Sequence, residues 1–244
     1  MKNAASTTPS RMRRDTTAER IKRLILSRGL RPGDAIPPEP ELCQELGVSR
    51  SSLREAIRTL ATLDIVEVRH GSGTVVGQMS LDSLVETLVF RGVLSTGDDL
   101  AVLREVVELR AALDLALADK VIAAHRGQSS SSLAALVAEM VASAGAGQTF
   151  LQADRQFHTE LLAPIDNQLA GQMVAAFWDI HSAVLPRLGL ALPADLRQTA
   201  KAHGDILAAA EAGDTAAYRR SVIEHYEPLQ RMLRTTARAG DPQG

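Results

Sequence analysis

The segment ADRQFHTELL, residues 153–162, places an acid and an imidazole four positions apart in an otherwise apolar, helix-favouring run. Residues i and i+4 share one face of a helix, so Asp154 and His158 point the same way. Two further histidines, His203 and His225, lie on apolar faces of later segments. Imidazoles on the inward faces of separate helices are costly to bury unless each finds a partner. One divalent metal ion would satisfy all four side chains together, whereas separate hydrogen bonds would satisfy them one at a time.

The neighbours of such an ion would decide its chemistry. Four protein ligands leave positions open on a metal that accepts five or six. A metal-dependent hydrolase would place activated water there and would need a general base beside the metal. Glu160 and Glu224 are the two acidic residues that could serve as this base, but they fall on helix faces other than those of the histidines. A sensor would instead bind a carboxylate or hydroxyl of a small effector, and purely structural histidines without a metal are a third hypothesis.

Composition favours helices packed on helices as the scaffold for these residues. The 244-residue chain is 45% apolar but only 3% aromatic, and alanine and leucine fill most long segments. No apolar run reaches the roughly 18 residues that indicate a membrane span, and the polar amino-terminal segment lacks the apolar core of a signal peptide. The single cysteine, Cys43, excludes an intramolecular disulfide and suits a reducing compartment. We therefore expect a cytoplasmic protein with no membrane association.

Turn residues and charge predict two domains with different partners. Residues 1–14 are expected to form a disordered basic tail, and residues 239–244 a second tail. Residues 15–78 combine three short helical segments with a β-hairpin, the order of a winged helix–turn–helix. Residues 79–238 are helical throughout and predict an all-α bundle of about seven helices. Residues 1–77 contain 13 basic and 9 acidic residues, whereas the rest of the chain contains 14 basic and 20 acidic residues.

The segment SRSSLREAIRTLATL, residues 49–63, offers side chains that could contact a DNA duplex. Ser49 is the expected N-cap of this helix, whose free N–H groups and partial positive charge suit phosphate oxygens. Its first turn and a half can reach base edges in a major groove and carries Arg50, Ser51, Ser52 and Arg54. The tip of the predicted hairpin, which could enter a minor groove, carries Arg69, His70 and Gly71. A capped, solvated helix that contacts no DNA is the alternative.

The stretch IPPEPELCQELGVSRSSLREAIRTLATLDIVEVRHGSGTVV resembles the DNA-binding domain of the GntR family of bacterial transcription regulators. The resemblance implies base contacts from Arg50 and Arg54, and wing contacts from His70 and Gly71. It also implies phosphate contacts from three hydroxyls, those of Ser49, Ser51 and Ser52. The family usually has an arginine where this chain has Pro40. Proline cannot donate to DNA, so one contact is missing and the operator is expected to differ from the family's common one.

Four later motifs are similar to the effector-binding (FCD) domain of the FadR subfamily: VLREVVELRAALDLALADKVIAA, DRQFHTELL, AHGDILAAAEAGD and IEHYEPL. The resemblance implies a metal bound by Asp154, His158, His203 and His225. Zinc is the first expectation, with nickel or manganese as alternatives. The candidates for effector contacts are Arg110, which could pair with a carboxylate, and Asn167 and Thr199, for which capping or surface polarity is the alternative. His181 is expected in the core or the pocket wall.

These features together predict a mainly α-helical, ligand-responsive transcription regulator and not an enzyme. A homodimer would place two recognition helices in successive major grooves of a near-palindromic operator. The resemblance implies a repressor that is released by a small organic acid, such as a sugar acid or hydroxy acid. The rival from another class is a metal-dependent hydrolase with an accessory DNA-binding domain.

Overall fold

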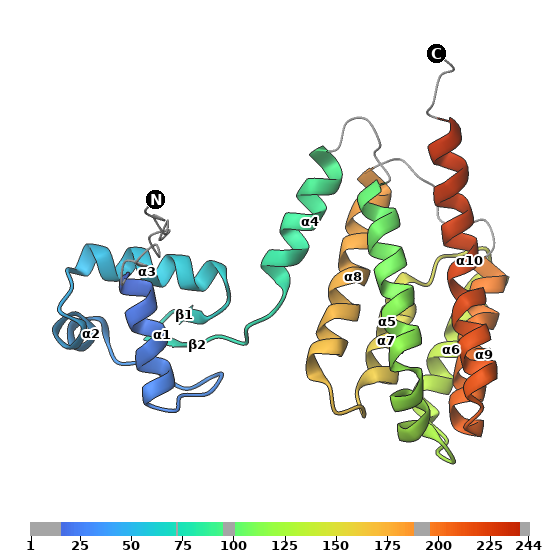
Figure 1. Ribbon diagram of the computed structural model, residues 1–244, viewed down its shortest axis with the longest axis horizontal. Helices are drawn as coiled ribbons and strands as arrows, with labels where there is room; N and C mark the ends of the chain where they lie inside the picture. Colours follow the sequence, from blue (N-terminus) through green and yellow to red (C-terminus); the bar gives the residue numbers. More distant parts are fainter. Residues whose placement is uncertain (1–15, 72, 95–100, 188–195, 240–244) are drawn as a thin grey trace, which may run out of the picture. The chain divides into compact units, whose positions relative to one another are not determined.

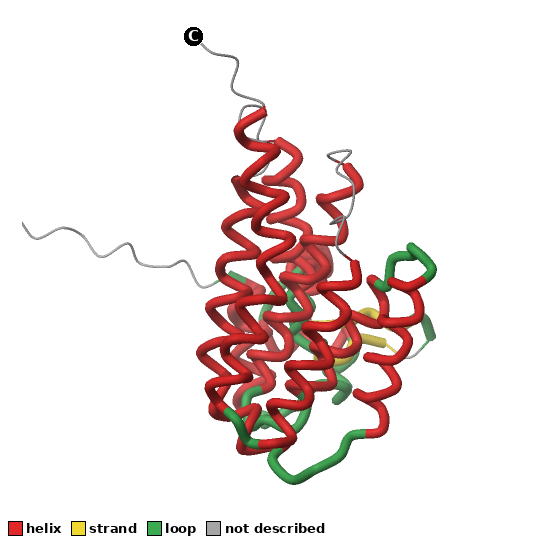
Figure 2. The backbone as a smooth tube through the Cα atoms, turned by 90° about the vertical axis from the view of Figure 1, so that its right-hand side faces the viewer, coloured by secondary structure: helices red, strands yellow, loops and turns green. Residues whose placement is uncertain are grey.

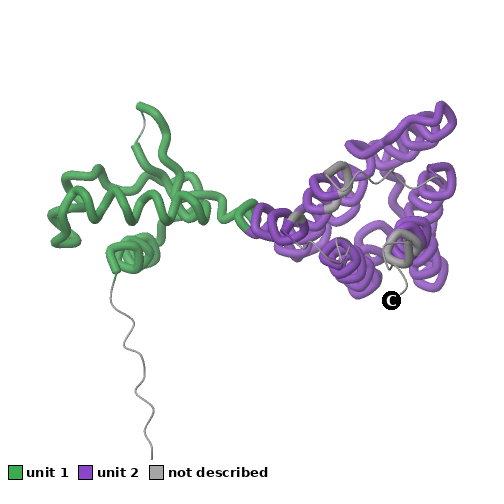
Figure 3. Tube along the Cα trace, turned by 90° about the horizontal axis from the view of Figure 1, so that it is seen from above, with its two compact units in different colours: residues 1–83 green, residues 84–244 purple. Residues whose placement is uncertain are grey.

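The computed structural model describes residues 16–71, 73–94, 101–187 and 196–239. The chain divides into two compact units, Met1–Ser83 and Leu84–Gly244, which are coloured separately in Figure 3. Most of the two predicted tails lies outside the described residues. Helices dominate both units, and the strands are confined to one small hairpin (Figure 2). The prediction of a mainly helical protein is confirmed.

The first unit contains three helices and a two-stranded sheet (Figure 1), in the order α1 (Thr17–Ser27), α2 (Glu39–Leu46), α3 (Arg50–Thr62), β1 (Val66–Arg69) and β2 (Gly73–Val76). The turn between α2 and α3 is set by Gly47, which has a φ of 63° and so occupies the left-handed region that glycine tolerates. Ser49 then caps α3 as predicted, because its side chain accepts a hydrogen bond from the Ser52 amide at 3.1 Å.

The hairpin packs onto these helices through its apolar face. β1 and β2 pair antiparallel in a register that sets Val66 opposite Val76 and Arg69 opposite Gly73. Val66 and Val76 are buried with residues of all three helices, among them Ile21, Leu42 and Leu60. The hairpin tip is therefore left in solvent while its base is held by the core, which is the arrangement of a winged helix–turn–helix.

The second unit is a bundle of seven described helices, seen nearly end-on in Figure 3. They are α4 (Asp82–Leu94), α5 (Ala101–His125), α6 (Ser131–Gly145), α7 (Leu151–Leu162), α8 (Gln168–Arg187), α9 (Leu196–Ala212) and α10 (Thr215–Ala239). One continuous apolar core joins them, and Leu103, Val121, Phe157 and Ile180 are among its fully buried members. None of the described helices is long and apolar enough to cross a membrane.

The packing of α5, α7, α9 and α10 determines where polar side chains can meet inside this bundle. α9 and α10 pack on each other, and both pack on α5 (Figure 1). α6 bridges α7 and α9. The inward faces of α5, α7, α9 and α10 consequently surround one interior region, although α5 and α10 are far apart in the sequence.

Candidate metal centre and adjoining pocket

Four sequence-predicted residues meet in the interior of the second unit. Asp154 and His158 come from α7, His203 from α9 and His225 from α10, and each offers a ligand atom within 4.8 Å of the others. The Nε2 atoms of His158 and His225 lie 3.3 Å apart. Oδ1 of Asp154 is 3.4 Å from Nε2 of His158 and 3.5 Å from Nε2 of His203. The three helices thus direct three nitrogens and one carboxylate toward a common point.

The three histidines and Asp154 are largely buried, so their polar atoms need bonding partners inside the protein. His203 is fully buried, His158 and His225 nearly so, and the Asp154 side chain is only 15% exposed. Nδ1–H of His203 donates to the carbonyl oxygen of Thr199 at 2.8 Å, which leaves the lone pair on Nε2 facing the cluster. That Nε2 has no hydrogen-bond partner among the described residues. A bound ion would satisfy a buried nitrogen left in this way.

The protonation states suit metal binding as well. Burial lowers the pKa of His158 well below its usual range, and the nearby Arg110 guanidinium acts in the same direction. Burial alone would raise the pKa of Asp154, but His203, His158 and Arg110 together hold the pKa of this carboxyl well below its usual range. A neutral imidazole and an ionised carboxylate are the forms that bind a metal. The residues present therefore fit a divalent metal ion.

Further polar groups lie around Asp154, and three of them, Trp178, Asp114 and Tyr226, were missed by the sequence analysis. The indole Nε1–H of Trp178 donates to Oδ1 of Asp154 at 3.1 Å, and Nη2 of Arg110 lies 3.6 Å from the same oxygen. The Tyr226 hydroxyl donates to the buried carboxylate of Asp114, and burial raises the pKa of both groups. Asp114 follows Arg110 by four positions in an apolar helix, a spacing that could have indicated it.

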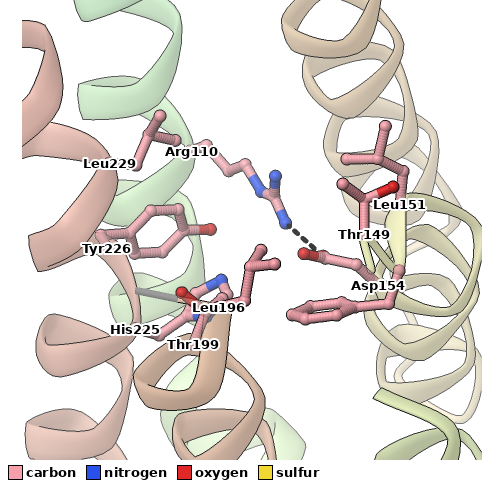
Figure 4. A pocket seen from close by; sticks show the side chains of 10 residues that line it. Arg110, Thr149, Leu151, Asp154, Leu196, Thr199, His225, Tyr226 and Leu229 are labelled. Atoms are coloured by element: carbon pink, nitrogen blue, oxygen red, sulfur yellow. Dashed lines mark ion pairs between the residues drawn. The ribbon is translucent and has the colours of Figure 1, made fainter. Parts of the chain in front are cut away.

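A cavity of about 60 Å³ adjoins the four-residue cluster. Figure 4 shows Arg110 reaching across it toward Asp154, with Tyr226 and Leu229 on one side and Thr149 and Leu151 on the other. Its lining consists of Arg110, Thr149, Phe150, Leu151, Asp154, Leu196, Thr199, His225, Tyr226 and Leu229. The pocket therefore includes two members of the cluster, Asp154 and His225.

Two of the three predicted effector-contact residues line this pocket, and one does not. Arg110 is 4% exposed, with its guanidinium carbon 5.5 Å from the centre of the Tyr226 ring, and Thr199 lies near the start of α9. Asn167 is not among the lining residues. Its Oδ1 instead accepts a hydrogen bond from the Ala170 amide at 3.1 Å. Asn167 thus caps the start of α8, as asparagine often does, and its contact with an effector stays a prediction.

The remaining polar candidates lie away from the cluster. Glu160 accepts a hydrogen bond from Gln156, and Glu224 is exposed, so neither lies in the pocket as a general base. His125 is buried, and its Nε2 lies 2.9 Å from the carbonyl oxygen of Leu161, which joins α5 to the end of α7. The side chain of His181 lies outside the described residues.

In the first unit, the predicted DNA-contacting residues are exposed around the amino end of α3. The hydroxyl of Ser49 lies 2.9 Å from those of both Ser51 and Ser52. Arg50 is exposed, and the Arg54 guanidinium, also exposed, forms an ion pair with Glu39 at 3.1 Å. This carboxylate comes from the start of α2 and orients Arg54 beside the first turn of α3.

The wing residues occupy the hairpin tip. Arg69 ends β1 and pairs with Glu67 at 2.9 Å, and His70 and Gly71 follow in the exposed turn. Gly71 has a φ of 79°, a backbone conformation that a side chain would disfavour. The sequence-predicted tip thus forms an exposed turn that carries both a cationic and an imidazole side chain.

Known proteins match both units. Residues 13–76 match the bacterial regulatory proteins of the gntR family, and residues 105–228 match the FCD domain. The galactonate operon transcriptional repressor of Escherichia coli K12 is 28% identical over 174 residues, which cover 70% of this chain and 75% of that protein. The mannosyl-D-glycerate transport/metabolism system repressor MngR of the same organism is 48% identical over 59 residues, 24% of this chain and 25% of that protein.

A solved structure resembles most of the chain. Streptococcus agalactiae GntR superposes with a TM-score of 0.64 and 29% sequence identity, over 89% of this chain and 98% of that one.

Metal-free protein is expected to lose stability as the pH falls from 7 to 5.5. Burial holds His158 neutral in the folded protein, whereas the same imidazole binds a proton below about pH 6.5 in the unfolded chain. The unfolded state then binds more protons, and one such group lowers the free energy of unfolding by up to about 1.4 kcal/mol per pH unit. The lowered pKa of Asp154 matters only below about pH 4, outside this window.

Thermal unfolding at several pH values, followed by the fluorescence of Trp178, measures this effect, because Trp178 is the single tryptophan of the chain and lies in the second unit. His158→Gln is expected to flatten the pH dependence. The control is His70→Gln on the exposed hairpin tip, which is expected to leave the dependence unchanged. An unaltered pH dependence in His158→Gln would mean that another group is responsible.

Proposed function

Because this chain belongs to the GntR family of bacterial regulatory proteins and carries an FCD domain, we propose that it represses a catabolic operon. A small organic acid, either a sugar acid or a hydroxy acid, binds at a metal centre in the second unit and releases the repressor from its operator. The chain is a DNA-binding transcription regulator and not an enzyme, in keeping with relatives that are named as transcriptional repressors.

The observation that carries this proposal is the convergence of a buried cation and the four-residue cluster on one pocket. Asp154, His158, His203 and His225 would hold the metal, with zinc as the first expectation and nickel or manganese as alternatives. A bound divalent ion would supply open coordination positions for a carboxylate or hydroxyl oxygen. Arg110 faces the same pocket and can form a charge-assisted hydrogen bond with the acid.

Signalling requires that the acid binds one conformation of the protein better than another. The pocket is lined by residues of α5, α7, α9 and α10, so an acid that contacts several of them favours one arrangement of these helices. Such coupling between effector and operator is reciprocal and is typically about 1–3 kcal/mol. Thr199 is a second effector contact in this scheme, since it lines the pocket and orients His203 through its carbonyl oxygen.

Operator binding is assigned to the exposed end of α3 and the hairpin tip. The cap at Ser49 and the hydroxyls of Ser51 and Ser52 suit phosphate oxygens at a helix amino terminus. Arg50 and Arg54 would contact base edges in the major groove, and Arg69, His70 and Gly71 would contact the minor groove. A homodimer would present two such surfaces to a near-palindromic operator.

The nature of the effector follows the chemistry of the pocket and the name of a relative. A cavity with one cation and a metal site beside it suits an acid that carries a hydroxyl. The galactonate operon repressor, which this chain matches over most of its length, is named for a sugar acid that is also a hydroxy acid. The same name supports repression as the mode of regulation.

Arg54→Ala is expected to weaken binding to the operator about 10- to 100-fold while leaving the second unit folded, because a bidentate contact between arginine and guanine contributes about 1–3 kcal/mol. The operator is obtained by selection of duplexes from a random pool with the native protein. Fluorescence anisotropy at one fixed salt concentration gives the dissociation constants, since phosphate contacts make affinity depend steeply on salt.

Arg58→Ala is the matched control for this experiment. Arg58 lies one helical turn after Arg54 on α3, carries the same charge and is 78% exposed at its side chain, compared with 61% for Arg54. We expect this variant to lose no more than a few-fold in affinity. Equal losses in the two variants would contradict the assignment of Arg54 to base recognition.

Replacing both His203 and His225 by Asn is expected to remove the bound metal, because it deletes two of the four ligands from two different helices. Elemental analysis of purified protein should fall from about one metal ion per chain to near zero. The response of operator affinity to organic acids should disappear with it. His70→Asn, which alters an exposed histidine of the first unit, should retain the metal. Full metal content in the double variant would refute the site.

A further inference from the structure

We propose that Glu39 is a positioning residue for DNA recognition, which holds the Arg54 guanidinium in the orientation that reads guanine. This inference rests on the proposed function, because it takes Arg54 as a residue that contacts a base edge. It goes further in assigning part of the discrimination between bases to a carboxylate that contacts no base itself.

The contact between these two side chains joins the two helices of the helix–turn–helix. Oε1 and Oε2 of Glu39 lie 3.2 and 3.1 Å from Nε of Arg54, and Oε2 also lies 3.1 Å from Nη2. Glu39 is the first residue of α2, and Arg54 lies one turn into α3. Glu39 stands between Pro38 and Pro40, whose rings fix φ at the positions before and after it. The carboxylate is therefore held on a restricted backbone.

The geometry of the contact leaves the donors of Arg54 that suit guanine unused. A guanidinium carries five N–H donors in one plane, and the carboxylate of Glu39 covers the side formed by Nε and Nη2. Both N–H groups of Nη1 and one of Nη2 take no part in this contact. Two such nitrogens match the O6 and N7 acceptors of guanine, whereas adenine presents an amino donor in place of O6. Held in this way, Arg54 can bind guanine and is mismatched with adenine.

The pair is exposed, so the stability of the fold does not account for it. The side chain of Arg54 is 61% exposed and that of Glu39 is 39% exposed, and ion pairs between exposed side chains contribute little to stability. A carboxylate beside a DNA-binding surface also repels phosphates and lowers the affinity for every sequence. An arginine that is already held, however, loses less conformational freedom when it binds. Glu39 thus lowers general affinity and increases discrimination between bases.

Glu39→Ala tests this role in the full-length protein. The operator is the duplex that the native protein selects from a random pool. The base pair read by Arg54 is the pair at which replacement of guanine no longer weakens binding in Arg54→Ala. The native protein is expected to discriminate against an A·T pair at this position about 10- to 100-fold. In Glu39→Ala this ratio should fall below about threefold, because the unheld guanidinium can turn toward phosphates, which carry no sequence information.

The ratio of the two dissociation constants separates this role from a structural one. If Glu39 only held α2 against α3, Glu39→Ala would lose affinity for both duplexes equally, and the ratio would stay within about twofold of the native value. That result would overturn the inference and leave the proposed function intact. If no base pair depends on Arg54, the proposed contact of Arg54 with a base is wrong, and the inference fails with it.

Glu39→Gln provides a second variant, which keeps the length of the side chain and one acceptor oxygen but removes the charge. Its ratio is expected to lie between those of Glu39→Ala and the native protein. A native ratio in this variant would contradict the need for a carboxylate that accepts from both Nε and Nη2 of Arg54.

Glu41→Ala is the matched control for both variants. Glu41 lies in the same first turn of α2, carries the same charge and is exposed. Its removal therefore changes the helix dipole and the repulsion of phosphates in a similar way. We expect the affinities for both duplexes to rise together, with the ratio unchanged. A fall in the ratio as large as that in Glu39→Ala would mean that charge near the duplex, and not the contact with Arg54, sets the discrimination.

Discussion

The central constraint in the second unit is the burial of one carboxylate together with three imidazoles whose nitrogens converge on it. Such groups are costly to remove from water unless opposite charge or hydrogen bonds compensate. Arg110 and the indole of Trp178 compensate Asp154 in part. Nε2 of His203 is left facing the cluster, because Nδ1 of the same ring is engaged with Thr199. A divalent ion would satisfy these groups together, and its presence would couple the stability of the bundle to metal binding.

The same constraint explains why the pocket suits a sensor. Ligands from α7, α9 and α10 and the guanidinium from α5 meet at one place, so whatever binds there contacts four helices at once. An acid that engages the ion and Arg110 changes the balance of charge in a region of low dielectric, where such changes are large. The first unit has separate chemistry, in which a capped helix end and arginines face solvent.

Much of this organisation could be predicted from the sequence, because it depends on residues that lie close together in the chain. The spacing of Asp154 and His158 indicates a shared helix face, and Ser49 before an amphipathic segment indicates a cap. The resemblance to the GntR family and its FCD domain, read from short motifs, is confirmed. The contacts of Trp178 with Asp154 and of Tyr226 with Asp114 could not be predicted, because they join helices whose packing is set by the whole core. The sequence could not separate two roles for Asn167, because asparagine at a helix start suits a cap and a binding site equally well, and the structure places it at the start of α8.

X-ray diffraction from crystals of the metal-loaded protein, recorded on both sides of the zinc absorption edge, tests the central claim most directly. The account predicts one strong anomalous peak per chain between Asp154, His158, His203 and His225, at roughly 2.0–2.2 Å from the ligand nitrogens and oxygen. Absence of a peak at this position from crystals of protein that contains zinc, or a peak coordinated by other residues, would contradict it.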